Sequence, residues 1–125
     1  MSDFTLFLSD DKKAKEYVAK ANGLGVPNPF NDREIIFDNE SAFTVVVFGD
    51  KVILQSIRSF VPRSGAGTRL MHKLVELADE IKVPLYLNPV PFGTSAMTKR
   101  NLIEFYKKFG FVGNSKEMIR FVRSK

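Results

Sequence analysis

Apolar residues recur along this chain at two periods, and the changes between them mark the expected elements. Alternation over short runs predicts β-strands. We expect strands at Asp3–Leu8, Glu34–Asp38, Ala42–Phe48, Lys51–Phe60, Leu85–Leu87, Phe111–Gly113 and Met118–Arg123. Spacings of three and four residues predict α-helices. We place them from an N-cap at Ser9 to about Asn22, at Thr68–Ile81, and from an N-cap at Thr98 to Phe109.

The order of these elements predicts the fold class. Two short connections, Asn39–Ser41 and Gly49–Asp50, join the three central strands into an antiparallel meander. The strand, glycine turn, helix and strand that follow predict a parallel crossover. We therefore expect a single domain over residues 1–125 with an α+β (mixed α/β) fold. In it, about three helices would flank a mixed six- to seven-strand sheet with an antiparallel N-terminal meander.

Irregular stretches of the pattern indicate where a site would lie. Between Leu54 and Ile57 the alternation of the third meander strand fails, which predicts a β-bulge of the kind often found beside ligands. The loop Leu24–Arg33 is rich in proline and asparagine, and its Phe30 is expected either over a substrate or against the core. A second loop, Asn88–Ser95, is expected at the same end of the sheet.

The turn after the meander has the pattern of an anion site. Gly65 and Gly67 lie between the last meander strand and the helix Thr68–Ile81. Glycine adopts positive φ without strain and lets a ligand approach the backbone. The first amides of a helix lack an intrahelical partner, and the helix dipole adds partial positive charge there. Such a turn suits phosphate, although a tight turn with nothing bound fits the same residues.

Composition narrows the function classes. The chain carries nineteen Lys and Arg against fourteen Asp and Glu, a net charge of +5. A nucleic acid or a polyanionic cofactor would account for this excess, but no nucleic-acid motif is present, so nucleic acid is not expected. The absence of cysteine excludes disulfides and thiolate chemistry, and no metal site is expected. No apolar run suits a signal peptide or a membrane span, so we expect a soluble cytoplasmic protein without a membrane partner.

Together with two local motifs, this order of elements resembles the GNAT superfamily of N-acetyltransferases. The turn Arg63–Thr68 is similar to the family's Arg/Gln-x-x-Gly-x-Gly/Ala loop, whose amides hold the pyrophosphate of acetyl-CoA. The segment Leu102–Phe111 matches the family's Tyr-x-x-x-Gly-Phe signature, with Tyr106 as its tyrosine. The compact chain is similar to small GNAT proteins of bacteria and their phages.

The resemblance implies roles for particular residues. Tyr106 would be the general acid that protonates the leaving thiolate of coenzyme A, since a phenol with a pKa near 10 is matched to a thiol. Ile57 would pair its backbone with the pantetheine arm, and the amides after Gly65 would hold the pyrophosphate. The cofactor-binding set that the resemblance implies is Ile57, Arg63, Ser64, Gly65, Ala66, Gly67 and Thr68.

The sequence departs from the family pattern in two places. Only Ser64 separates Arg63 from Gly65, so the loop is one residue short, and Lys99 stands where the family commonly has asparagine. The strand Lys51–Phe60 also has no carboxylate, although some family members use a carboxylate on this strand as the base. A water positioned by a polar strand residue or a carboxylate from a neighbouring strand remain candidates: Gln55, Ser56 and Ser59, or Glu34, Asp38 and Glu40. His72 is expected to be a solvated helix residue.

The resemblance implies an acetyl-CoA-dependent N-acetyltransferase in which a primary amine attacks the thioester directly. The acceptor would be a small molecule or a protein lysine or N-terminus, and the sequence does not identify it. The shortened loop and the missing carboxylate motivate an alternative, a GNAT-fold protein that binds acetyl-CoA or a protein partner without catalysis. A homodimer is compatible with the sequence.

Overall fold

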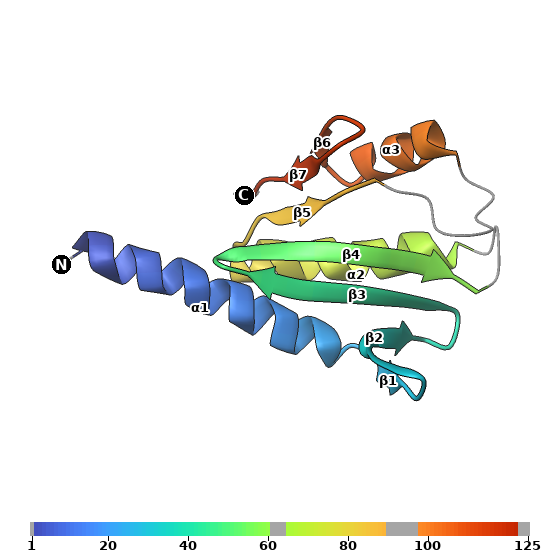
Figure 1. Cartoon of the computed structure of the whole chain (residues 1–125), viewed down its shortest axis with the longest axis horizontal. Helices are drawn as coiled ribbons and strands as arrows, with labels where there is room; N and C mark the ends of the chain where they lie inside the picture. Colours follow the sequence, from blue (N-terminus) through green and yellow to red (C-terminus); the bar gives the residue numbers. More distant parts are fainter. Residues whose placement is uncertain (1, 61–64, 90–97, 123–125) are drawn as a thin grey trace.

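One mixed sheet organises the chain (Figure 1). The structure, a computed structural model, describes residues 2–60, 65–89 and 98–122, and within residues 2–11 only the backbone. The helices are α1 (Ser2–Asn22), α2 (Ala66–Ile81) and α3 (Lys99–Lys107). The strands are β1 (Val26–Asn28), β2 (Asn31–Phe37), β3 (Ser41–Phe48), β4 (Lys51–Ser59), β5 (Leu85–Leu87), β6 (Val112–Gly113) and β7 (Met118–Arg120).

The topology confirms the predicted fold class. The seven strands lie in the order β1-β2-β3-β4-β5-β7-β6. Strands β1 to β4 are antiparallel neighbours, and β4 pairs with β5 in parallel across the crossover helix α2. Strand β7 lies antiparallel between β5 and β6. This is an antiparallel N-terminal meander in a mixed sheet with three helices, as expected.

The core lies where α1 and α2 pack against each other and against β3 and β4. The apolar stripe of α2 is fully buried at Leu70 and Leu74, because residues three and four apart share one face of a helix. Tyr17 of α1 is buried as well, and its hydroxyl donates to the Leu74 carbonyl at 2.8 Å. Burial raises the pKa of Tyr17 well above its ordinary value.

The predicted bulge is present in β4. Thr44 of β3 faces Ser56, but the next residue, Val45, faces Leu54. Gln55 is therefore the extra residue on β4, and its side chain is exposed. An extra residue increases the local twist and re-aims the side chains beside it, which places polar groups of β4 at the centre of the sheet.

The expected N-terminal strand at Asp3–Leu8 and the N-cap at Ser9 are both wrong. The chain is helical from Ser2, so Ser9 lies inside α1, and the N-terminal part of α1 extends past the sheet (Figure 1). The apolar residues of this run fit two patterns. Phe4, Leu6 and Leu8 alternate as in a strand, whereas Phe4, Phe7 and Leu8 have the spacing of one helix face. No glycine or proline separates this run from the helix that follows.

The loop Leu24–Arg33 was wrongly expected to be irregular, since it contains β1 and the start of β2. Pro27 is tolerated because β1 is an edge strand, where a missing N–H breaks no ladder. Gly25 lies so close to β2 that a Cβ there would be 2.0 Å from the Ile36 oxygen. Phe30, at the β1–β2 turn, is 97% exposed, so packing against the core is wrong.

The C-terminal elements follow the predictions with shifted ends. The N-cap at Thr98 is confirmed, because its hydroxyl accepts from the Asn101 amide at 3.1 Å. Helix α3 ends at Lys107 rather than Phe109, and Gly110 adopts a φ of 95° after it. The last two strands are shorter than expected. Strand β6 starts at Val112 rather than Phe111 and ends at Gly113 as expected, whereas β7 starts at Met118 as expected and ends at Arg120.

Candidate active site

Strands β4 and β5 stop pairing halfway along β4. Their last pair is Leu54 with Leu87, whereas β4 continues to Ser59 along β3. Within the described residues, no strand lies against the other edge of β4 beyond Leu54. Ile57 is in this stretch, with its side chain half-buried against the core. An open strand edge presents backbone donors and acceptors to an extended ligand.

Helix α2 begins at the same end of β4. Its N-cap, Gly65, has a φ of 81°, which confirms the predicted need for glycine at this position. The first helical hydrogen bond runs from the Arg69 amide to the Gly65 oxygen at 3.0 Å, so the amides of Gly67 and Thr68 precede it. Gly65 has no side chain with which to cap this terminus, and no acidic residue lies in the first turn of the helix. Arg63 and Ser64 lie outside the described residues.

Packing of α3 against α2 brings the two sequence motifs together. A Cβ added at Gly67 would lie 3.9 Å from Cζ of Phe105, the residue before Tyr106. Further along, the ring of exposed His72 meets Phe109 edge-on at 5.2 Å. His72 therefore borders the α2–α3 contact, as expected for a residue on the solvated side of the helix. The glycine turn and the tyrosine segment lie on neighbouring elements.

Tyr106 is a buried phenol. It is 6% exposed, and its ring meets Phe105 at 5.5 Å and Phe111 at 5.6 Å, both edge-on. Burial raises the pKa of Tyr106 to about 12, because a low-dielectric surrounding disfavours the phenolate. No hydrogen bond joins its hydroxyl to another side chain or backbone group of the described residues. This phenol keeps its proton throughout the physiological pH range, but it is a weaker acid than the expected phenol with a pKa near 10 and so matches a thiol less closely.

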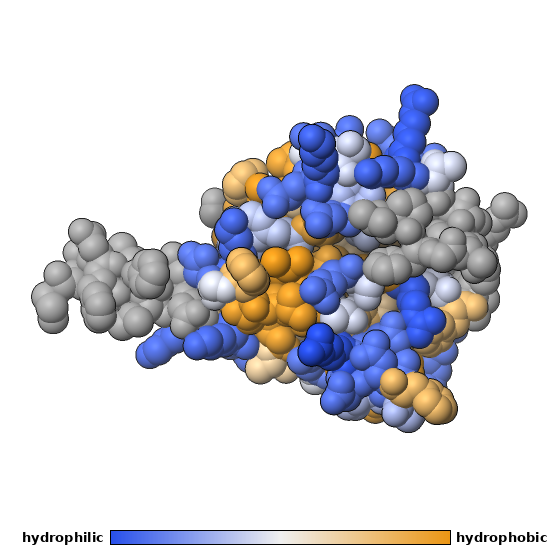
Figure 2. Space-filling model, in the orientation of Figure 1, coloured by the Kyte–Doolittle hydropathy of each residue, from blue (hydrophilic) through white to orange (hydrophobic). Residues whose placement is uncertain are grey.

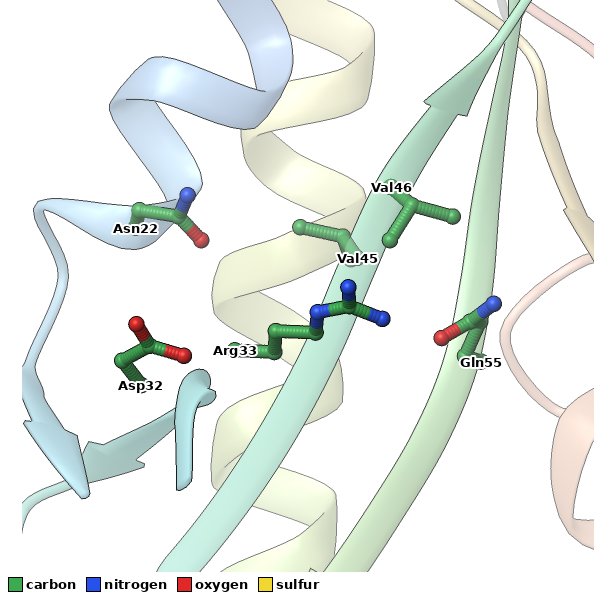
Figure 3. Close-up of a pocket in the computed structure, with 6 residues that line it drawn as sticks. All are labelled: Asn22, Asp32, Arg33, Val45, Val46 and Gln55. Carbon is green, nitrogen blue, oxygen red and sulfur yellow. The ribbon is translucent and has the colours of Figure 1, made fainter. Parts of the chain in front are cut away.

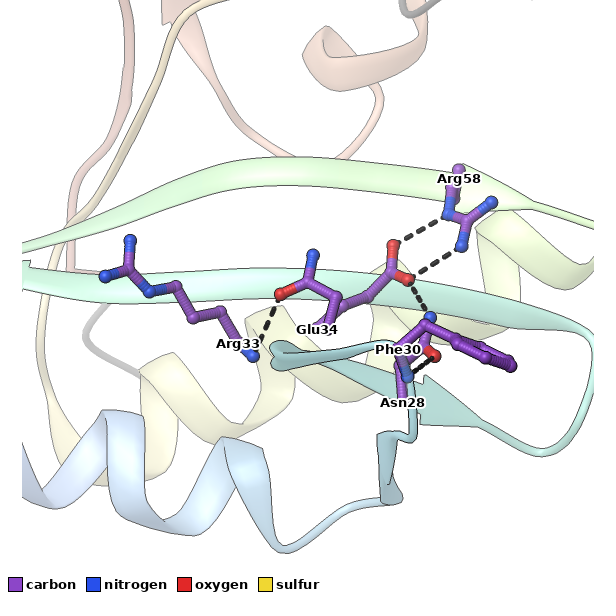
Figure 4. A network of polar contacts seen from close by, with 6 residues as sticks. Asn28, Phe30, Arg33, Glu34 and Arg58 are labelled. Atoms are coloured by element: carbon purple, nitrogen blue, oxygen red, sulfur yellow. Dashed lines mark hydrogen bonds and ion pairs between the residues drawn. The ribbon is translucent and has the colours of Figure 1, made fainter.

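Two candidate bases are held in ion pairs. Glu34 is buried and accepts from Arg58 Nε and Nη2, each at 2.7 Å, and from the Asn28 amide at 2.8 Å (Figure 4). The hydrogen bonds from Arg58 lower the pKa of Glu34, against the opposing effect of burial. Glu40 pairs with Arg69. A carboxylate stabilised in its charged form is a weak base, so Glu34 is poorly suited to take a proton from an amine.

A polar cleft lies around the β4 bulge. Two adjoining hollows, of about 390 and 830 Å³, share Arg33 of β2 and Gln55 of β4. The smaller is shown in Figure 3 and is lined by Asn22, Asp32, Arg33, Val45, Val46 and Gln55. The larger is lined by Asn31, Arg33, Thr44, Ile53, Leu54, Gln55, Ser56 and Asn88. It reaches the place where β4 and β5 separate, since Leu54 and Asn88 lie there.

The sequence marked only part of this cleft. Gln55 and Ser56 were singled out as residues, whereas Asn31, Arg33 and Asn88 were included only as members of the two loops expected near a site. Thr44 carried a signal: it is a polar residue in the middle of the apolar strand Ser41–Phe48, and it is buried. Figure 2 shows that apolar side chains gather on this face of the molecule between polar areas.

Other kinds of site find no support in the described residues. No three side chains of His, Cys, Asp or Glu gather there in a way that would bind a metal ion. None of the described helices is both long and apolar enough to cross a bilayer.

Comparisons with known proteins bear on the fold. No protein-family profile matches the chain, and neither does any curated protein sequence. Among solved structures, it is similar to the anti-CRISPR protein AcrVA5, with a TM-score of 0.56 and 21% identity over 65% of this chain and 90% of that one. The putative N-acetyltransferase YhhK from E. coli, solved with coenzyme A, has a TM-score of 0.49 and 15% identity over 84% and 86% of the two chains.

At these identities a structural likeness concerns the fold. The likeness to AcrVA5, together with the strand order and the crossover helix, confirms the predicted GNAT-like fold. Any activity must be argued from the residues of this chain.

The two glycines of the α2 turn predict opposite responses to alanine. Gly65→Ala places a side chain at a φ of 81° and should lower the free energy of unfolding by about 1–2 kcal/mol. Gly67→Ala meets only Phe105 at 3.9 Å and should raise that free energy by up to about 1 kcal/mol through helix propensity. Urea unfolding of both variants measures this. Equal destabilisation would contradict the assignment of the N-cap to Gly65.

Proposed function

We propose that this chain, as one domain, is an N-acetyltransferase that moves an acetyl group from acetyl-CoA to a primary amine. The observation that supports this proposal is the end of the β4–β5 pairing at Leu54 and Leu87, at the same end of the sheet as the N-terminus of α2. An open strand edge and a helix N-terminus at one end of the sheet suit a ligand with an extended arm and a diphosphate. Acetyl-CoA has both.

In this proposal the residues of the turn and of β4 hold the cosubstrate. The amides of Gly65, Ala66, Gly67 and Thr68 would donate to the pyrophosphate, aided by Arg63 and Ser64 in the same loop. The backbone of Ile57, on the open part of β4, would pair with the pantetheine arm. The thioester then lies towards the bulge at Gln55, where the larger hollow opens.

The proposed chemistry is a direct displacement. The nitrogen lone pair of a neutral amine attacks the carbonyl carbon, the C–S bond breaks, and the sulfur takes a proton from the Tyr106 hydroxyl. Because Glu34 and Glu40 are engaged in ion pairs, a water held by Gln55 and Ser56 would take the proton of the amine, and solvent would return a proton to the Tyr106 phenolate. Holding amine and thioester in contact supplies several kcal/mol of the barrier reduction.

Thermal unfolding with acetyl-CoA tests the binding half of the proposal. Ligand at a hundred times its Kd should stabilise the protein by about 2.7 kcal/mol, which is a shift of several degrees. The matched control is pantetheine, which lacks the diphosphate and should stabilise less. No shift with millimolar acetyl-CoA would refute the proposal. A shift without turnover on any amine would instead support a protein that binds acetyl-CoA without catalysis.

A further inference from the structure

The polar cleft holds an arginine that the proposed reaction does not use. Arg33 lines both hollows, and its guanidinium extends over β3 towards Gln55 (Figure 3). Within the described residues this guanidinium makes no ion pair or hydrogen bond. In contrast, Arg58, Arg69 and Arg120 are each paired with a carboxylate.

The carboxylates on either side of Arg33 in the sequence form no ion pair with it. Asp32 lines the smaller hollow beside Asn22 (Figure 3), and within the described residues no ion pair joins it to Arg33. Glu34 is committed to Arg58, and Figure 4 shows the Arg33 side chain extending away from that pair. In the larger hollow, Arg33 is the one formally charged lining residue that the structure describes. The cleft therefore offers a positive charge to an incoming acceptor.

The remaining lining residues fit a short aliphatic chain. Val46 and Ile53 pair across β3 and β4 beside Arg33, and both are half-buried. Beyond them, Gln55 and Ser56 offer hydrogen bonds near the proposed thioester position. Strands β2 and β4 are separated by β3, so at about 4.8 Å per neighbouring pair their backbones are about 10 Å apart. The Arg33 side chain extends over β3 and covers part of this distance (Figure 3), which leaves a span of a few bonds between its guanidinium and the bulge.

We propose that the acceptor is a small aliphatic amine that carries an anionic group, a carboxylate or a phosphate, and that Arg33 binds that group. This inference rests on the proposed acetyl transfer. A guanidinium presents a planar fork of donors that matches either group. A cleft of about 830 Å³ has the size of a small-molecule site. The positive charge also lowers the pKa of a nearby ammonium group, which favours the neutral amine that attacks.

Paired acceptors test the inference in a thiol-release assay with acetyl-CoA. γ-Aminobutyrate is compared with n-butylamine, and O-phosphoethanolamine with ethanolamine, so that within each pair the main difference is the anionic group. If Arg33 binds the anionic group, kcat/KM should be about tenfold or more higher for one or both anionic amines than for their neutral partners. The phosphate and carboxylate arms then show which group the cleft prefers. Equal values within both pairs, or faster transfer to lysine peptides than to every small amine, would overturn the inference.

Variants of Arg33 test whether this side chain causes the preference for anionic amines. Arg33→Gln should raise KM for the anionic amine about tenfold to a hundredfold, with kcat and the KM for acetyl-CoA changed little. Arg33→Lys should restore part of the loss because it retains the charge. Arg100→Gln is the matched control, since Arg100 is an exposed arginine of α3 away from the cleft. A loss of similar size in n-butylamine turnover would mean that Arg33 is merely structural.

A binding measurement separates failure of this inference from failure of the proposed function. The protein loaded with coenzyme A is titrated with γ-aminobutyrate and with O-phosphoethanolamine, and chemical shifts are followed by NMR. Binding that Arg33→Gln abolishes, without turnover of any amine, would refute catalysis and leave the anion site standing. Turnover of amines with no dependence on Arg33 would refute the anion site and leave the acetyltransferase standing.

Discussion

Replacing Tyr106 by phenylalanine is expected to slow acetyl transfer by about 10²-fold or more, while leaving the fold and the binding of acetyl-CoA nearly intact. Loss of a positioned general acid has an effect of this size. The variant retains the ring that meets Phe105 and Phe111 edge-on. Because the hydroxyl makes no hydrogen bond within the described residues, its removal breaks no interaction that holds the fold there. Steady-state thiol release measures the change.

The control for this variant is Tyr86→Phe, which removes a phenol from β5 without touching the proposed acid. Its kcat should match the parent value. If Tyr106→Phe retains parent kcat and the same dependence on amine concentration, Tyr106 has no part in proton transfer. A thermal unfolding curve of each variant shows whether a loss of activity reflects loss of the fold.

The pH dependence of the acetyl-transfer rate is a second test of the role of Tyr106. A general acid must be protonated, and burial raises the pKa of Tyr106 to about 12. Transfer should therefore increase with pH as the amine loses its proton, and no decline from loss of the acid should appear below about pH 11. The same raised pKa means that the folded state holds this proton more tightly than the unfolded state. Its contribution to stability is complete below pH 10 and is lost as the pH rises towards 12.

The largest predicted effect on stability comes from Arg120→Ala. Arg120 is 3% exposed and binds Asp79 through both Nη atoms, at 2.8 and 2.9 Å, while its Nε donates to the Phe109 oxygen at 2.8 Å. These contacts join β7 to α2 and to the end of α3. Breaking a buried ion pair from one side costs about 3–5 kcal/mol, so Tm should fall on the order of 10 °C or more.

Arg100→Ala is the control, because Arg100 is exposed on α3 and its loss should change the free energy of unfolding by less than about 0.5 kcal/mol. A double-mutant cycle with Asp79→Asn then isolates the pairwise interaction. If Arg120→Ala unfolds with the parent Tm, the three hydrogen bonds do not hold the C-terminal strands to α2. In that case, contacts other than those of Arg120 hold the end of α3 in place.

The parts of the fold that could be predicted depend on local patterns. The stripe containing Leu70 and Leu74 defines α2, the Gly49–Asp50 turn defines the β3–β4 hairpin, and the broken alternation at Gln55 defines the bulge. Each of these signals lies within one element. The prediction failed where one pattern has two solutions. Phe4, Phe7 and Leu8 suit a helix, whereas Phe4, Leu6 and Leu8 suit a strand. The segment is helical, and it continues through α1 without a break.

The site was less predictable because its charges are placed by tertiary contacts. Arg120 looked like one of several basic residues near the end of the chain, yet it is buried against Asp79, forty-one positions away. Glu34 was a candidate base, and only the pairing of β2 with its neighbours shows that Arg58 holds it. Arg33 had no distinguishing neighbour in the sequence. The glycine turn and Tyr106 were located from their motifs, which depend on spacing alone.

In the proposed function, this protein transfers an acetyl group from acetyl-CoA to an amine. The most direct test incubates the protein with acetyl-CoA labelled with ¹³C in the acetyl group and with the panel of anionic and neutral amines, and identifies products by mass spectrometry. Acetyl transfer with Tyr106 as the general acid predicts a labelled N-acetyl product and an equal amount of free coenzyme A, and the Tyr106→Phe variant should form much less of both. Binding of acetyl-CoA with no labelled amide from any amine, peptide or protein acceptor would contradict it.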